Sequence, residues 1–138
     1  MRRIASLLRD IRGSAAVEFA VAVPVLIVMI WGIFQVAMVL QARAGVQQAL
    51  GEGARYATIF NPATNARPTN TQISNKIVSS KFGIRNGTWQ TPSINTTNEA
   101  SGGYIVISVQ YSVPTNFLIF SGPTITLSQS KRVYIQKA

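Results

Sequence analysis

The apolar residues of the chain are concentrated in one stretch near its start. Residues 19–40 are all apolar, glycine or proline, with Gln35 as the one exception. Because a helix rises about 1.5 Å per residue, this stretch extends roughly 33 Å, close to the bilayer's hydrocarbon core of about 30 Å. We therefore predict a single transmembrane helix over residues 14–40.

A buried core helix and a cleaved secretory signal fit the apolar stretch less well. A buried core helix needs apolar partner segments around it, and no other segment of the chain is apolar enough. A cleaved secretory signal has an apolar region of about 7–15 residues followed by a small-x-small site, whereas residues 41–57 continue as a helix. Pro24 lies inside the span, and its missing N–H predicts a kink that membrane helices tolerate.

The charges that flank the span predict its orientation. Four arginines and one aspartate precede it, whereas Arg43 is the one charge close to its far end. Cytoplasmic segments beside membrane helices carry an excess of lysine and arginine. We therefore expect residues 1–13 to be a cytoplasmic leader and residues 41–138 to be exported. The leader arginines are Arg2, Arg3, Arg9 and Arg12.

Beyond the span, the chain is predicted to continue as an amphipathic helix over residues 41–58. No helix breaker occurs before Asn61 and Pro62. One helix face carries a small residue at every fourth position, namely Gly45, Ala49, Gly53 and Ala57. This face either packs against a sheet of the same chain or admits a neighbouring helix in a filament.

Residues 59–138 are predicted to form a small exported α+β domain. Residues 69–72 (Thr-Asn-Thr-Gln) match a capping box that opens a short helix. The apolar positions of this helix are Ile73, Ile77 and Val78. The polar segment 83–103 is rich in glycine, asparagine, threonine and serine, and it holds a strand around residues 88–94.

Two stronger strands follow. Residues 104–113 alternate apolar and polar side chains, which is typical of a half-buried strand, and residues 124–135 form a second one. Gln129 and Lys131 interrupt the apolar face of the second strand, which predicts a bulge or an edge position. The predicted fold class is therefore α+β. A long N-terminal helix, membrane-spanning in its first half and amphipathic in its second, carries a small C-terminal antiparallel sheet.

The segment between the two strands is unusually apolar. Residues 116–120 read Asn-Phe-Leu-Ile-Phe, so Phe117 and Phe120 lie where a polar turn is usual. This segment either folds as a flap onto the core or contacts the membrane or a neighbouring subunit, because exposed apolar patches often mark interfaces.

The composition of the chain argues against an enzyme. There is no cysteine and no histidine, which removes thiolate chemistry, the commonest general base and the commonest metal ligand. The four carboxylates are Asp10, Glu18, Glu52 and Glu99, and they form no recognisable catalytic or metal-binding spacing. The net charge of +9 invites a nucleic-acid interpretation, but the positive residues are scattered and no binding motif accompanies them. We expect no cofactor, no metal and no nucleic-acid partner.

Glu18 is the most informative polar residue, since apolar residues surround it where the span begins. Either its side chain extends to the lipid headgroups near Arg9 or Arg12, or it pairs with a specific cation. Gly13 indicates where such a cation could come from. Glycine has no side chain, so it leaves the following peptide bond unhindered for a protease at the cytoplasmic membrane face. Cleavage there would give Ser14 a new ammonium group one helical turn from Glu18, where pairing offsets the cost of burying either charge.

Residues 12–20 (Arg-Gly-Ser-Ala-Ala-Val-Glu-Phe-Ala), followed by Pro24, resemble the processing site of type IV pilin-like proteins. They are most similar to TadE-like minor pilins, or pseudopilins, of the Tad (Flp) pilus system. The resemblance is strong over residues 12–58 and looser over residues 104–135. It implies cleavage between Gly13 and Ser14 and a role for Glu18 and Phe19 in assembly.

The resemblance also implies a function and partners. A prepilin peptidase would remove the leader of a single-pass protein of the bacterial inner membrane. The mature chain would then enter, prime or cap a Tad-type pilus, contacting other pilin subunits and the inner-membrane assembly platform. The alternative is a membrane-anchored periplasmic binding or adhesion module that is never cleaved.

Overall fold

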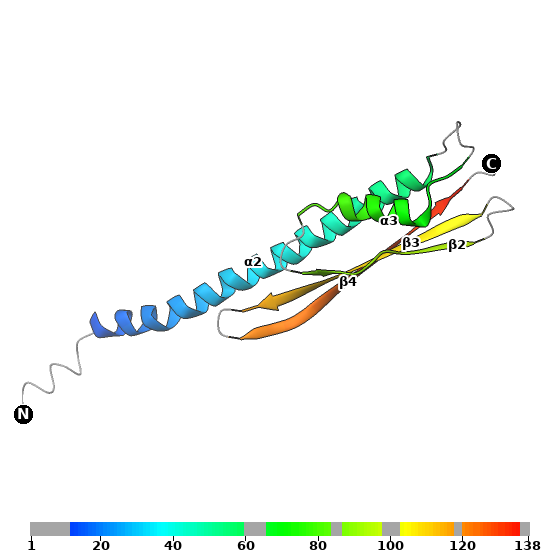
Figure 1. Cartoon of the computed structure of the whole chain (residues 1–138). Helices are drawn as coiled ribbons and strands as arrows, with labels where there is room; N and C mark the ends of the chain where they lie inside the picture. Colours follow the sequence, from blue (N-terminus) through cyan, green and yellow to red (C-terminus); the bar gives the residue numbers. More distant parts are fainter. Residues whose placement is uncertain (1–11, 60–65, 84–86, 98–102, 118–119, 136–138) are drawn as a thin grey trace, which may run out of the picture.

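A computed structural model describes residues 12–59, 66–83, 87–97, 103–117 and 120–135. Its elements, in chain order, are α2 (Arg12–Ala57), α3 (Asn70–Ser79), β1 (Thr88–Trp89), β2 (Ser93–Thr97), β3 (Tyr104–Asn116) and β4 (Ser121–Tyr134). The C-terminal half of α2 lies along the sheet, while its N-terminal half projects beyond it (Figure 1). The predicted α+β class, with one long helix and a small antiparallel sheet, is confirmed.

Helix α2 runs for 46 residues without a break and ends at Ala57, so the predicted helical continuation beyond residue 40 is confirmed, one residue shorter than expected. At about 1.5 Å per residue it is roughly 69 Å long, about twice the length that a bilayer core requires. At its end the Thr58 hydroxyl and amide both donate to the Arg55 carbonyl, at 2.7 and 3.2 Å. Pro62 follows shortly afterwards and disfavours a further helical turn.

The small residues of α2 face the inside of the domain. The four members of the predicted face, Gly45, Ala49, Gly53 and Ala57, are all buried within this single chain. At Gly53 a methyl group would overlap the side chain of Ile77 from α3, whose Cδ1 would lie 2.8 Å away. In the structure, the small-residue face therefore packs within its own chain, which is the first of the two alternatives predicted for it.

Helix α3 begins as the sequence predicts. The Thr69 hydroxyl accepts a hydrogen bond from the Gln72 amide at 3.3 Å, and the Gln72 side chain accepts one from the Thr69 amide at 2.9 Å. Ile73 and Ile77 are fully buried against α2, as expected. Val78 is 39% exposed, so its assignment to the apolar face was wrong: it follows Ile77 directly and lies about 100° further round the helix.

Strand β3 is the centre of the sheet. It pairs antiparallel with β4 along one edge and with β1 and β2, one after the other, along the opposite edge. Its inward residues are all buried: Ile105, Ile107, Val109, Tyr111 and Val113. The alternation predicted for residues 104–113 is therefore confirmed, and the strand extends three residues further.

The strand predicted around residues 88–94 is divided into β1 and β2. Gln90 still donates its amide to the Gln110 carbonyl at 3.0 Å, but Pro92 has no N–H to continue the ladder. Beside β1, Gly87 lies so close to the Tyr111 ring that a Cβ would overlap the hydroxyl. Burial raises the pKa of Tyr111 above its ordinary value, an effect that a hydrogen bond with the Gly87 backbone partly offsets.

Strand β4 occupies an edge, which is one of the two outcomes predicted from Gln129 and Lys131. Among the described strands it pairs with β3 alone, through a continuous register from Tyr134 opposite Tyr104 to Thr124 opposite Pro114. The bulge alternative was wrong at those two residues, because the register shift lies between Pro114 and Asn116 instead. An edge strand tolerates polar side chains on both faces, since one of its sides meets solvent.

The close contact of Gly53 with α3 generates a stability prediction. We expect Gly53→Ala to destabilise the full chain by about 1–3 kcal/mol, because the added methyl group has no space beside the buried Ile77. Gly51→Ala is the matched control: its Cβ would meet nothing within 4 Å, so helix propensity should stabilise it by up to about 1 kcal/mol. Thermal unfolding in detergent, followed by circular dichroism, measures both. Equal shifts for the two variants would contradict close packing of Gly53 against Ile77.

Candidate functional site: the uncovered half of the long helix

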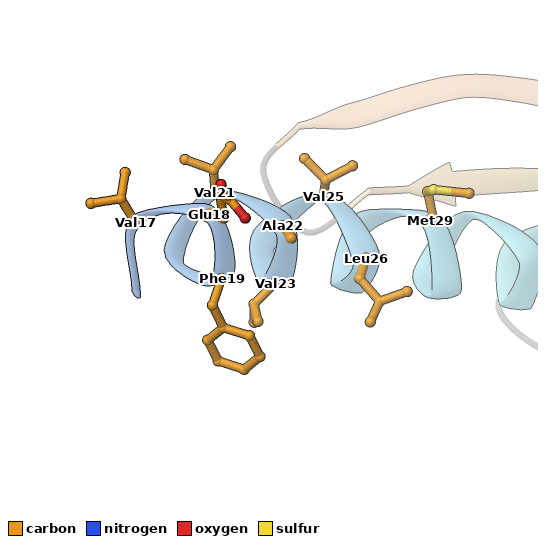
Figure 2. Close-up of a pocket in the computed structure, with 9 residues that line it drawn as sticks. All are labelled: Val17, Glu18, Phe19, Val21, Ala22, Val23, Val25, Leu26 and Met29. Atoms are coloured by element: carbon orange, nitrogen blue, oxygen red, sulfur yellow. The ribbon is translucent and has the colours of Figure 1, made fainter. Parts of the chain in front are cut away.

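The N-terminal half of α2 exposes large apolar side chains around its circumference. Phe19 is 71% exposed, and most neighbours on the following turns are more than half exposed. Figure 2 shows nine of the side chains between Val17 and Met29, which point outwards in several directions. They line an open apolar groove, to which the single charged contributor is Glu18. Among the described residues, no other segment covers α2 between Val17 and Met29.

This exposure separates α2 from the core helix of a soluble protein. Helix residues Gly13–Ala57 are long and apolar enough to cross a membrane, and only 6% of their most apolar 18-residue window is buried. A core helix of similar composition would be mostly buried, because water around so many apolar groups costs about 25 cal/mol per Å². The helix thus fits a single-pass membrane anchor.

The predicted cleavage residues lie in the first turn of α2. Gly13 is exposed, and nothing would contact a Cβ placed on it within 4 Å. The Ser14 hydroxyl donates a hydrogen bond to Glu18 Oε1 at 3.3 Å, so these side chains share one helix face. The structure therefore brings together the two residues whose charges are expected to pair after cleavage.

Two further predicted residues lie on the same segment. Phe19 follows Glu18 in the sequence, and its ring projects outwards on a different side of the helix (Figure 2). Pro24 lies inside α2, which remains helical on both sides of it. Because proline lacks an N–H, the carbonyl of Ala20 has no intrahelical donor there.

The leader falls outside the described residues. This applies to residues 1–11, and therefore to Arg2, Arg3, Arg9 and Asp10, while Arg12 is described only as the first residue of α2. The alternative that places Glu18 beside Arg9 or Arg12 thus concerns side chains that the structure does not describe. Within the described residues, no group of three or more histidine, cysteine, aspartate or glutamate side chains could hold a metal.

A contact between α2 and the β3–β4 turn was not among the features predicted from the sequence. Trp31 Nε1 and Gln35 Nε2 both donate to the backbone carbonyl of Asn116, at 2.8 and 2.6 Å. Gln35 is buried at 6% exposure although it interrupts an apolar stretch. A signal was available: two side-chain donors one turn apart in an apolar helix share one face and require an acceptor.

Within the apolar segment 116–120, Leu118 and Ile119 lie outside the described residues, and Phe117 lies beside α2. The rings of Phe117 and Phe120 stack with centroids 5.0 Å apart, and the two backbones exchange hydrogen bonds of 2.9 and 3.2 Å. Phe117 is partly buried and lines an apolar groove with Val36 and Leu40 of α2. Phe120 is 61% exposed, so for this residue the first of the two alternatives, a flap onto the core, was wrong.

Comparison with known proteins adds one match. Residues 13–55 match the model of the TadE-like protein family, which confirms the resemblance over the helix and associates the chain with pilin-like proteins of the Tad pilus system. The looser resemblance over residues 104–135 lies outside the matched residues. No curated protein and no solved structure matches the chain.

The contact between α2 and the turn generates a second prediction. Gln35→Leu removes one of two donors to the Asn116 carbonyl, and a neutral hydrogen bond contributes about 1 kcal/mol. We therefore expect amide hydrogen exchange between Ser112 and Ile125 to accelerate about fivefold. Gln48→Leu, at an exposed position of the same helix, should leave it unchanged. Unchanged exchange in Gln35→Leu would show that the bond does not hold the turn.

Proposed function

We propose that this protein is a non-enzymatic minor pilin, or pseudopilin, of a Tad-type pilus, assembled after its leader is removed. The observation that carries the proposal is the uncovered apolar half of α2, which bears Glu18 near its start and lies inside the TadE-like match. Neither a catalytic centre nor a nucleic-acid interface has a corresponding arrangement of side chains in the described residues.

The proposal begins with membrane insertion. The uncovered half of α2 has the length and composition of a single span, and the arginine-rich leader favours a cytoplasmic N-terminus. We therefore assign residues 14–40 to the bacterial inner membrane. Residues 59–138 form an exported domain, and the amphipathic segment 41–58 joins the two parts.

Leader removal is the next step of the proposal. Gly13 lies at the very end of the described helix, where the first N–H groups have no intrahelical acceptors and local unwinding costs little. Its lack of a side chain and of close neighbours leaves the bond to Ser14 accessible to a prepilin peptidase. The family match also begins at Gly13.

Cleavage would change the electrostatics at Glu18. The new ammonium of Ser14 would lie one turn away, on the helix face where the Ser14 hydroxyl already contacts the carboxylate. In an apolar environment each of these charges is costly alone, and pairing within one chain or with a neighbour lowers that cost. Glu18 would therefore guide the helix into a bundle of equivalent helices, with Phe19 filling the adjacent contact.

During assembly the N-terminal half of α2 would move from one apolar environment to another. Lipid would surround it before assembly, and the helices of other pilin subunits would surround it in the filament. The inner-membrane assembly platform of the Tad system would transfer the helix between them. In this scheme the protein enters, primes or caps the pilus as a structural subunit.

The proposed cleavage predicts the effect of bulk at Gly13. Gly13→Leu should retain residues 1–13, because the side chain obstructs the bond while meeting nothing in the fold, whereas Gly13→Ala should be processed at least in part. Intact-mass measurement of the protein from its native cell separates the two products. Met1 still attached to the wild-type chain in a peptidase-competent cell would contradict cleavage and favour the uncleaved adhesion module.

The proposed pairing predicts the effect of removing the carboxylate. Glu18→Ala should still be processed in part but should impair assembly, since an unpaired buried charge costs about 3–5 kcal/mol per subunit. Glu52→Ala, in the part of α2 that lies along the sheet, is the matched control and should assemble normally. The readout is the amount of pilus in the sheared fraction. Normal pili from the Glu18→Ala strain would rule out the charge-pairing account.

A further inference from the structure

We propose that the β3–β4 turn inserts Phe117 and Phe120 into the outer boundary of the same bilayer that α2 crosses, so that lipid is its partner. The inference rests on the proposed function only in requiring α2 to span the membrane. It adds a second membrane contact, made by the exported domain itself.

The depth of the β3–β4 turn in the bilayer can be estimated from the number of α2 residues between the cytoplasmic end of the helix and the residues that contact the turn. Trp31 lies 18 residues after Gly13, about 27 Å along the axis, and Gln35 lies about 33 Å along. Measured from Glu18 instead, these distances are about 20 and 26 Å. Since the hydrocarbon core is about 30 Å thick, both starting points place the helix contact of Asn116 in the outer part of the bilayer.

The turn is attached to the helix at that depth. The Asn116 carbonyl accepts from Trp31 and from Gln35, and Phe117 lines a groove against Val36. A backbone carbonyl held by two side chains cannot move along the helix without losing both bonds. The position of α2 in the membrane therefore sets the position of the turn.

The chemistry of the turn suits lipid. Phe120 is 61% exposed and stacks on Phe117, so these two residues form an aromatic apolar surface at this end of the hairpin. The two residues exchange backbone hydrogen bonds, so their amides and carbonyls are satisfied without water, as contact with the hydrocarbon boundary requires. No charged residue occurs in the sequence between Glu99 and Lys131.

The opposite end of the same hairpin differs. Lys131 and Arg132 are paired with Ile107 and Val106, eight or more residues from the turn, and Arg132 lies 4.4 Å from the centre of the Tyr104 ring. At about 3.4 Å per residue these cations lie roughly 30 Å from the tip, well outside the bilayer. The hairpin is thus apolar where it would meet lipid and charged where it would meet water.

The absence of cysteine from the chain permits a direct test. A nitroxide label is placed at Ser121→Cys, which adjoins Phe120 and leaves both phenylalanines intact, with the full chain in vesicles of phosphatidylethanolamine and phosphatidylglycerol. Power-saturation electron paramagnetic resonance then compares collisions with oxygen, which concentrates in lipid, and with a water-soluble nickel chelate. We expect the oxygen-to-nickel ratio at Ser121→Cys to exceed several-fold that at Ser130→Cys, an exposed position on the same strand.

Two further variants distinguish a failure of the membrane anchor from a failure of the lipid contact. Val25→Cys reports the span itself: a low ratio there would overturn the membrane anchor and with it the proposed function. A high ratio at Val25→Cys with a low ratio at Ser121→Cys would overturn the lipid contact alone. Low collision rates with both reagents at Ser121→Cys would show that another protein surface covers the turn and would also overturn it. If lipid is the partner, Phe120→Asp should lower the ratio at Ser121→Cys and leave that at Val25→Cys unchanged.

Discussion

Close packing against the small-residue face of α2 is the constraint on which the rest of the structure depends. Gly53 leaves just enough space for Ile77, and the buried alanines of the same face let the sheet approach the helix. Larger side chains there would hold the second helix and the sheet away from α2 and expose the core. The buried apolar residues of α2 begin at Ala42, and further towards the N-terminus the domain contacts the helix near the β3–β4 turn, as far as Trp31. Before Trp31 most of the large apolar side chains of the helix are exposed.

One helix thus lies partly against the domain and partly uncovered, and polar side chains mark the position where these two parts meet. Trp31 and Gln35 lie where the uncovered apolar segment meets the domain, and each satisfies its donor on the Asn116 carbonyl. An unsatisfied amide in an apolar setting costs several kcal/mol, so a glutamine in this stretch requires its partner. The TadE-like match ends at residue 55 and therefore covers the helix alone. The β3–β4 turn, which supplies the Asn116 carbonyl, lies outside the residues that match the family.

Much of the fold could be predicted because local signals decide it. The hydropathy of residues 19–40, the capping box at Thr69 and the alternation in β3 each specify one element without knowledge of the others. Two predictions failed for different reasons. Val78 could not be excluded from a ten-residue helix with three apolar residues without knowing which helix face packs against α2. The split at Pro92 has a local cause instead, because proline has no N–H to continue the ladder. At the candidate site, spacing alone put Ser14 and Glu18 on one face, whereas the acceptor of Gln35 lies 81 residues away and leaves no local trace.

The attachment at Asn116 also couples the rotation of α2 about its own axis to the orientation of the sheet. A helix turns about 100° per residue, so the azimuth of α2 about its own axis determines the direction in which the sheet extends from that axis. With the turn held by two bonds on one face, the domain cannot swivel independently to correct a misaligned helix. In any assembly built through the uncovered half of α2, the side of the helix chosen for contact therefore decides which face of the sheet is presented outwards. A displacement of one residue in helix register would turn the whole domain by more than a quarter of a circle.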